Sequence, residues 1–290
     1  QLASETFQRR IDGFLAAPGK RRRIVIEVGS HRYRLKRRTR RDGTFFGTLT
    51  LPSDVLAGQI DQAARIEMRL LRAGTNHPVH VESTGDIFYA PPTGLSVISD
   101  IDDTIKFTEA TNRKALLINT FLNPFVAVDG MAEVYRQWQH AGCSFHYVSS
   151  SPWQLYQPLA QLCMDHGFPA GSMHLRYFRV RDEMFKRFRP LRHNSKVAIM
   201  VHLLKRLPER KFVLVGDSGE RDPEIYWFLA RRFPQNVVAI AIRNVPGHPL
   251  EDKRLRKLRE LGSGLTLRVF DAPAELADLV PALMHRVQAT

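Results

Sequence analysis

Three carboxylates, Asp100, Asp102 and Asp103, fall within four positions of the stretch VISDIDDTIKFT, residues 97–108. They directly follow a hydrophobic run that has the composition of a buried strand. Like charges this close repel one another, and each makes its neighbours harder to ionise. A divalent cation would offset the repulsion, because hard cations such as Mg²⁺ take carboxylate, phosphate and water oxygens as ligands. The stretch therefore favours metal-assisted chemistry on a phosphorylated substrate.

Further reactive side chains follow other apolar runs. Ser149 ends the run FHYV, and Asp217 and Asp222 follow the run FVLVG. Lys196 lies near the start of a helix expected over residues 195–208. In an open α/β sheet, ligands bind outside the carboxyl ends of the strands. We therefore expect these side chains to gather at one sheet edge with the first group of carboxylates.

The residue types at this edge suit phosphoryl transfer. Asp100 and Asp217 could hold the cation, and a carboxylate such as Asp100 can attack phosphorus to give an aspartyl-phosphate. Asp102, two residues later, could protonate the leaving oxygen and then deprotonate the water that hydrolyses the intermediate. Ser149 could donate a hydrogen bond to a phosphoryl oxygen, while Lys196 would offset negative charge.

Four segments of the chain resemble, in order, the motifs of the haloacid dehalogenase superfamily of phosphohydrolases: DIDDT, YVSS, Lys196 and GDSGERD. Within that superfamily, SDIDDTIK, YVSSSPWQLY and LVGDSGERDPEIY are similar to the catalytic domain of the actin-patch-associated phosphatidate phosphatase family and its bacterial relatives. The resemblance covers about residues 94–245. The stretch RDGTFFGTLTL also resembles, more weakly, part of the small sandwich domain that precedes the catalytic domain in bacterial relatives.

The resemblance assigns roles to individual residues. It implies Asp100 as nucleophile, Asp102 as acid and base, and Ser149 and Lys196 as phosphoryl contacts. It implies a Mg²⁺ site made by Asp100, the Asp102 main-chain carbonyl and Asp217, with Asp222 nearby. It further implies a phosphorylated lipid, phosphatidate above all, as substrate.

Simpler structural roles compete with several of these assignments. A lone pair of aspartates usually caps a helix or a turn, and we assign that role to Asp103. Ser150 and Ser151 compete with Ser149 for the phosphate contact. Asp222 could equally cap the helix that follows it.

The elements around these residues divide the chain into two expected domains. Residues 1–92 contain a short amphipathic helix and then alternate apolar and polar residues with period two, which predicts antiparallel strands. Asp42 and Gly43 are predicted to form a turn between two of these strands. The Pro- and Gly-containing stretch APPTG, residues 90–94, is expected to form the joint between the two domains. Residues 93–290 alternate apolar runs with helical patterns, which predicts a parallel sheet.

The predicted fold class is therefore α/β. We expect a three-layer, Rossmann-like domain of the haloacid dehalogenase type, preceded by a small antiparallel β-sandwich domain. The segment between Asp102 and Ser149 is too short for a large α/β cap, which leaves room for a bulky substrate.

The charge of the chain indicates anionic partners. A net charge of +14 and a pI near 10.2 attract phosphates on lipid, nucleic acid or small molecules. Two basic clusters lie at residues 36–41 and 176–192, and the second also contains aromatic residues. They favour peripheral contact with an anionic membrane, although a solvated basic surface would have the same composition. A phosphatase of nucleic-acid ends stays open as an alternative. So does a non-catalytic lipid-binding module, although the intact acid pair argues against it.

The remaining expectations concern location. No apolar run approaches the ~20 residues that span a bilayer, and the first residues lack the apolar core of a signal peptide. The sequence does not begin with Met, so a preceding segment could have been removed or left out. Cys143 and Cys163 are expected to be reduced thiols. We expect a cytoplasmic protein that can lie peripherally on a membrane.

Overall fold

The computed structural model describes most of the chain: residues 2–15, 19–41, 43–45, 47–56, 58–61, 64–72, 80–176 and 194–288. Its internal contacts form two units, a smaller one of Leu15–Ala90 and a larger one of Gln1–Phe14 with Pro91–Thr290. The first helix thus groups with the larger unit, whereas the sequence analysis placed it with the β domain. The division into domains at residue 92 stays a prediction.

The smaller unit contains a four-stranded antiparallel sheet in the order β2-β1-β3-β4. Its strands are β1 (Ile24–Val28), β2 (His31–Arg34), β3 (Arg65–Arg72) and β4 (His80–Phe88), and a short helix, α2 (Ser53–Leu56), accompanies them. Val28, Val55 and Ile66 form its buried apolar cluster. The predicted small antiparallel β domain is confirmed. The described residues of this unit form one sheet, so the predicted sandwich stays a prediction.

A hairpin turn at Gly29 and Ser30 joins β1 to β2. Gly29 has a φ of 56°, a left-handed conformation that glycine adopts without steric cost. Asp42 of the predicted turn lies outside the described residues, and the Gly43 amide donates to the Arg40 carbonyl oxygen over 3.0 Å.

The larger unit is built on a six-stranded sheet in the order β12-β11-β10-β5-β8-β9, with every neighbouring pair parallel. Its strands are β5 (Leu95–Ser99), β8 (Ser144–Pro152), β9 (Gly171–Arg176), β10 (Lys211–Asp217), β11 (Val237–Arg243) and β12 (Thr266–Phe270). Strands buried on both faces need apolar residues at successive positions, and every residue of β5 is buried. The predicted parallel sheet is confirmed.

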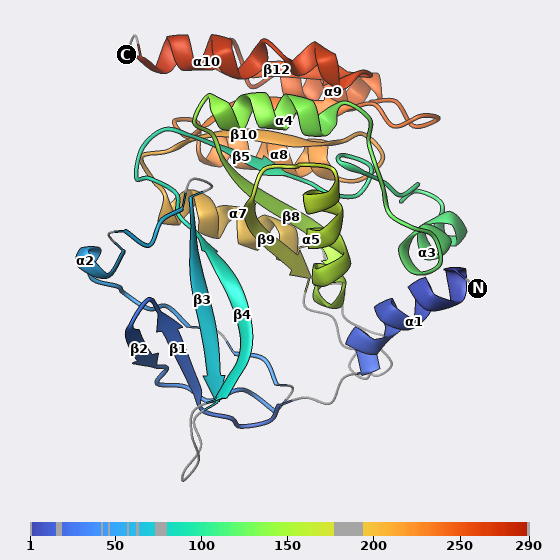
Figure 1. Ribbon diagram of the computed structural model, residues 1–290. Coiled ribbons are helices and arrows are strands. Elements are labelled where there is room, and N and C mark those ends of the chain that lie inside the picture. The colour runs from blue at the N-terminus through green and yellow to red at the C-terminus, as the bar shows by residue number, and fades with distance from the viewer. Residues whose placement is uncertain are drawn as a thin grey trace. The chain divides into compact units, whose positions relative to one another are not determined.

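Helices cover both faces of this sheet (Figure 1). Successive residues of β5 separate the layers: Val97 belongs to a cluster with side chains of α4 (Met131–His140), α5 (Tyr156–Asp165) and α10 (Leu279–Gln288). Ile98 belongs to a second cluster with side chains of α7 (Asn194–Arg206), α8 (Asp222–Arg232) and α9 (Asp252–Arg259). This arrangement confirms the three-layer α/β fold. The described residues of the unit also include two short 3-10 helices, η1 (Trp153–Leu155) and η3 (Pro273–Leu276).

Only a small insertion separates β5 from α4. It consists of β6 (Lys106–Phe107), α3 (Arg113–Phe121) and β7 (Val126–Ala127), which confirms the absence of a large cap. The first helix, α1 (Leu2–Leu15), contacts this insertion, because the Phe14 and Phe121 ring centroids lie 5.7 Å apart. Arg10 Nη1 also donates to the Thr120 carbonyl oxygen over 2.6 Å. These contacts explain why α1 groups with the larger unit.

Two further expectations can be compared with the structure. Cys143 and Cys163 are buried free thiols, as predicted. In the part of the chain that the structure describes, no helix combines the length and the apolar character that a membrane crossing requires.

A buried arginine fixes the joint in front of β5. The Arg210 side chain is 1% exposed and donates to the carbonyl oxygens of Pro91, over 2.6 Å, Thr93 and Leu95. Its Nε donates to Ser96 Oγ over 2.8 Å. One guanidinium therefore ties the joint and the first residues of β5 to the start of β10.

We expect Arg210→Met to lower the free energy of unfolding by about 3 kcal/mol, because buried carbonyl oxygens lose their donors. Urea unfolding measures this change. Lys205→Met, at an exposed position on α7, is the control and should stay within about 0.5 kcal/mol of the unsubstituted protein. Equal stability of the two variants would contradict the assigned role of Arg210.

Candidate functional site

The candidate site lies where the connections of the parallel sheet diverge. From the central strand β5 the chain passes to β8 on one side, and β10 pairs with β5 on the other. Asp100 directly follows β5, and Asp217 is the last residue of β10. The Asp100 amide donates to the Val215 carbonyl oxygen over 2.9 Å, which holds the two strand ends together. Such a switch point is where open α/β sheets bind ligands.

Asp100 and Lys196 form a buried ion pair. Asp100 is 0% exposed, and Lys196 Nζ lies 2.7 Å from its Oδ1. The same ammonium group donates to Asp222 Oδ1. Burial raises the pKa of Asp100 well above its usual value, against the opposing charge of Lys196. Burial alone would lower the pKa of Lys196, but the two carboxylates outweigh it and raise that pKa, so the ammonium stays charged.

Asp222 orients Lys196 and braces the end of β10. Its Oδ2 accepts from the Asp217 amide and from the Tyr226 hydroxyl, each over 3.3 Å. This packing requires a glycine at position 216, because a Cβ there would lie 2.1 Å from Asp222 Oδ2. Asp222 therefore contacts the catalytic candidates instead of only capping α8.

Asp102 is enclosed by four donors. Ser149 Oγ donates to its Oδ2 over 2.9 Å and Ser151 Oγ over 2.7 Å. Lys106 Nζ lies 2.8 Å from its Oδ1, and Thr108 Oγ1 donates to the same oxygen over 3.0 Å. Burial alone would raise the pKa of Asp102, but the Lys106 charge and these hydrogen bonds lower it to about 2. The carboxylate is therefore ionised in the unliganded protein.

The serine assignments can be compared with this geometry. Ser149 is buried and Ser150 is exposed, while Ser151 lies on the same face as Ser149 because side chains alternate along a strand. The site thus contains Ser149, as expected, and also Ser151.

Asp103 performs the structural role expected of it. It has a φ of 54°, and its carboxylate accepts from the amides of Thr108 and Glu109, each over 2.8 Å, and of Ala110 over 2.6 Å. Arg243 Nη1 donates to its carbonyl oxygen over 2.7 Å. Asp103 therefore closes the loop that carries Asp100 and Asp102.

Three carboxylates form a cluster that suits a divalent cation. Asp100, Asp217 and Glu220 each offer one oxygen, and these oxygens lie within 4.8 Å of one another. Asp217 Oδ1 accepts from the amides of Gly219 and Glu220, but its buried Oδ2 has no hydrogen-bond partner. Burial and neighbouring carboxylates raise the pKa of Asp217 to about 8 and that of Glu220 to about 7. An unpaired oxygen among crowded carboxylates fits a hard cation with oxygen ligands.

Sequence reasoning missed Glu220, although it lies within GDSGERD between Asp217 and Asp222. Its charge and its position in a motif at a strand end were the available signal. The turn that brings its carboxylate toward Asp100 depends on local backbone geometry, which the amino-acid sequence does not reveal.

Arg254 on α9 fixes the loop that carries Glu220. Its guanidinium donates to the carbonyl oxygens of Ser218, over 2.5 Å, and Glu220. Its Nε also donates to Glu224 Oε1 over 2.8 Å. A planar guanidinium held by several acceptors has little freedom, so α9 positions the cluster from outside the recognised motifs.

The predicted basic surfaces can be followed only in part. The side chains of Lys36, Arg37, Arg38, Arg40 and Arg41 are exposed in the smaller unit. Of the basic and aromatic stretch 176–192, only Arg176 belongs to the described residues. Membrane contact at either stretch stays a prediction.

Two curated relatives match the chain. One is the phosphatidate phosphatase APP1 of Saccharomyces cerevisiae, 32% identical over 262 residues, which cover 85% of this chain and 43% of the relative. The other is an uncharacterized protein of Schizosaccharomyces pombe, 30% identical over 185 residues, which cover 62% and 30% of the respective chains. The chain spans less than half the length of either relative.

Solved structures give weaker similarity. An uncharacterized protein from Listeria monocytogenes has a TM-score of 0.40 and 16% identity, with 66% of this chain and 97% of that chain covered. A HAD family hydrolase from Deinococcus radiodurans with bound phosphate and sodium has a TM-score of 0.36 and 19% identity, with 64% and 95% covered. These TM-scores are too low to support an argument about the fold. The fold assignment rests on the strand order described above.

A family model places the chain directly. The model of the phosphatidate phosphatase APP1 catalytic domain matches residues 95–244, which is more than half of the chain and includes β5, β8 and β10 with every predicted site residue. The chain therefore belongs to the family of the phosphatidate phosphatase APP1 catalytic domain.

Proposed function

We propose that this chain is a Mg²⁺-dependent phosphatase that hydrolyses a phosphomonoester through an aspartyl-phosphate on Asp100. The observation that carries the proposal is the setting of that carboxylate. It is fully buried at a strand end, paired with Lys196, and within 4.8 Å of oxygens of Asp217 and Glu220. Family membership supports the same reaction class.

The cation site proposed here consists of Asp100, Asp217 and Glu220 with the main-chain carbonyl of Asp102. Bound Mg²⁺ would neutralise these carboxylates and withdraw charge from the phosphoryl oxygens. Asp222 stays a predicted outer partner of this site, since its two oxygens bond to Lys196, the Asp217 amide and Tyr226.

The reaction proceeds in two displacements. An Asp100 carboxylate oxygen attacks phosphorus, the bond from phosphorus to the leaving oxygen breaks, and that oxygen takes a proton from Asp102. Asp102 then removes a proton from water, whose oxygen attacks the phosphorus and releases Asp100 and inorganic phosphate. Lys196 and Ser149 hold the phosphoryl oxygens in both steps.

Asp102 has to gain a proton before the first step. Its pKa of about 2 keeps it ionised when the site holds no substrate. An incoming phosphoryl dianion places negative charge beside it, which raises its pKa. A phosphoryl oxygen also competes for the Ser149 hydroxyl, one of the donors that now stabilise the ionised form. The same donors favour the ionised form that the second step requires.

We propose phosphatidate or a similar lipid phosphate as the substrate. The S. cerevisiae relative is named as a phosphatidate phosphatase, and the short insertion after β5 leaves the site without a large lid. Phosphate release from phosphatidate, lysophosphatidate, nucleotides and phosphorylated oligonucleotides tests this choice. Preference for the oligonucleotides would identify a phosphatase of nucleic-acid ends, and inactivity on the whole panel and on an aryl phosphate would refute the phosphatase proposal.

We expect Asp100→Asn to reduce turnover of an aryl phosphate by at least about 10³-fold, because an amide is a poor nucleophile. Phosphate release with Mg²⁺ measures the loss, and a thermal melt checks that the variant folds. Asp86→Asn, at an exposed position on β4, should keep full activity. Near-normal turnover by folded Asp100→Asn would remove Asp100 from the nucleophilic role.

Asp102→Asn should slow phosphorylation of the enzyme more for alkyl than for aryl phosphates. A good leaving group needs little protonation as its bond to phosphorus breaks. Rapid-quench measurements of the first step with both substrates give the two losses. Equal losses would show that Asp102 is not the general acid.

Mg²⁺ affinity should fall as the pH is lowered from 8 to 6 and level off above 8. Asp217 and Glu220, with pKa values of about 8 and 7, bind protons that the cation has to displace. Titration calorimetry at several pH values measures this dependence. Glu220→Gln should weaken binding by about tenfold or more, while the exposed control Glu209→Gln should not. Unchanged affinity in Glu220→Gln would exclude Glu220 from the site.

A further inference from the structure

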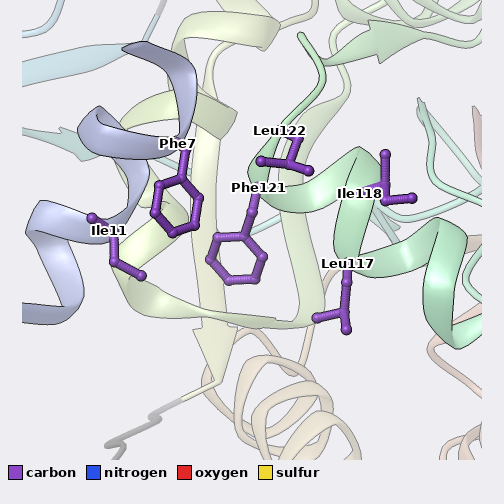
Figure 2. A pocket seen from close by; sticks show the side chains of 6 residues that line it. All are labelled: Phe7, Ile11, Leu117, Ile118, Phe121 and Leu122. Atoms are coloured by element: carbon purple, nitrogen blue, oxygen red, sulfur yellow. The ribbon is translucent and has the colours of Figure 1, made fainter. Parts of the chain in front are cut away.

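An open apolar groove lies between α1 and α3 of the larger unit. It has a volume of about 310 Å³ and is lined by hydrocarbon side chains only: Phe7 and Ile11 from α1, Leu117, Ile118 and Phe121 from α3, and Leu122 directly after α3. In Figure 2 the side chains of Phe7 and Ile11 extend from α1 toward Phe121 of α3. Without polar groups, such a groove suits a hydrocarbon ligand.

Further large apolar side chains are exposed in the larger unit. Leu117 is 59% exposed, and the others include Phe107 on β6, Val126 on β7, Trp153 on η1 and Tyr156 on α5. Most exposed large apolar side chains described in the larger unit lie on these segments, α1 and α3.

Hydrogen bonds connect the groove to the catalytic loop. Asn119 Nδ2, one residue beyond Ile118, donates to the Thr108 carbonyl oxygen over 3.0 Å. Thr108 Oγ1 in turn donates to Asp102 over 3.0 Å. Asn112 caps the start of α3 with its side chain. The helix that forms one wall of the groove is therefore anchored to the loop that carries Asp102.

The dimensions match a lipid chain. The nine residues of α3 span about 14 Å at 1.5 Å per residue. An acyl chain in one bilayer leaflet spans about half of the ~30 Å hydrocarbon thickness. The length of α3 thus matches the length of one acyl chain.

We propose that the groove between α1 and α3 binds the acyl chain of the phosphorylated lipid whose phosphate lies at Asp100. This inference rests on the proposed phosphatase function. The choice of occupant rests on the hydrogen bonds described above, since the helix that forms one wall of this hydrocarbon-lined groove is bonded to the loop that carries Asp102. The first turn of α3 contains no acidic residue and carries the exposed Lys114, which suits the negative charge of such a lipid.

Chain-length dependence tests the proposal. The substrates are monoacyl glycerol phosphates of six, eight and ten carbons, kept below the concentration at which they aggregate. Each methylene that the groove buries strengthens binding by up to about fourfold. We expect kcat/KM to rise at least about tenfold from six to ten carbons in the unsubstituted protein.

Leu117→Asp should reduce that tenfold rise to less than about threefold, because a carboxylate on the groove wall disfavours hydrocarbon. Met164→Asp is the matched control, since Met164 is a 66% exposed apolar residue on α5 that does not line the groove, and it should keep the full rise. Absence of the rise in the unsubstituted protein, or its persistence in Leu117→Asp, would overturn the proposal.

Photolabelling separates this inference from the phosphatase proposal. A monoacyl glycerol phosphate with a diazirine at the chain end is irradiated with Asp100→Asn, and labelled peptides are mapped by mass spectrometry. Labels within 7–11 or 117–122 support the groove even if the unsubstituted protein hydrolyses nothing, a result that would refute only the phosphatase. Turnover with labels confined elsewhere would refute only the groove. A dimer that Leu117→Asp dissociates, with the groove unlabelled, would assign the groove to a second copy and overturn the proposal.

Discussion

The site depends on an excess of buried negative charge at the switch point of the sheet. Asp100, Asp217 and Asp222 are fully buried, and Lys196 contacts two of them. Removing charges from water is costly unless they are paired. The negative charge that Lys196 does not balance, together with burial, raises the pKa values of Asp217 and Glu220. Binding of a cation would relieve this repulsion, so the fold itself favours metal binding here.

The surrounding elements make this crowding sterically achievable. Adjacent parallel strands bring Asp100 and Asp217 to one edge, and Gly216 leaves room for Asp222 behind the strand end. Asp103 holds the loop that carries Asp102, and Arg254 holds the loop that carries Glu220, each through main-chain groups. Because rigid hydrogen-bonded loops cannot move apart to relax the repulsion, the charges stay close together before any ligand arrives.

The sequence predicted the elements whose signal is local. Continuous apolar runs such as LSVIS identify strands buried on both faces, and the following carboxylates predict the site edge because parallel strands end together. The short elements β6, α3 and β7 gave no comparable signal. The grouping of α1 with the larger unit depends on contacts such as Phe14 with Phe121. Likewise, Arg254 acts across a long sequence separation, which no local pattern reveals.

The elements that support the site extend beyond the segment that the family model matches. Residues 95–244 contain all the side chains to which the reaction is assigned. Arg254, which fixes the loop of Glu220, lies after that segment, and α1, which forms one wall of the apolar groove, lies before it. The motifs therefore report the chemistry, whereas the flanking helices shape the cation site and the surface beside it. Since motif residues do not determine the substrate, the proposed acyl site at the α1–α3 groove depends on residues that the motifs do not include.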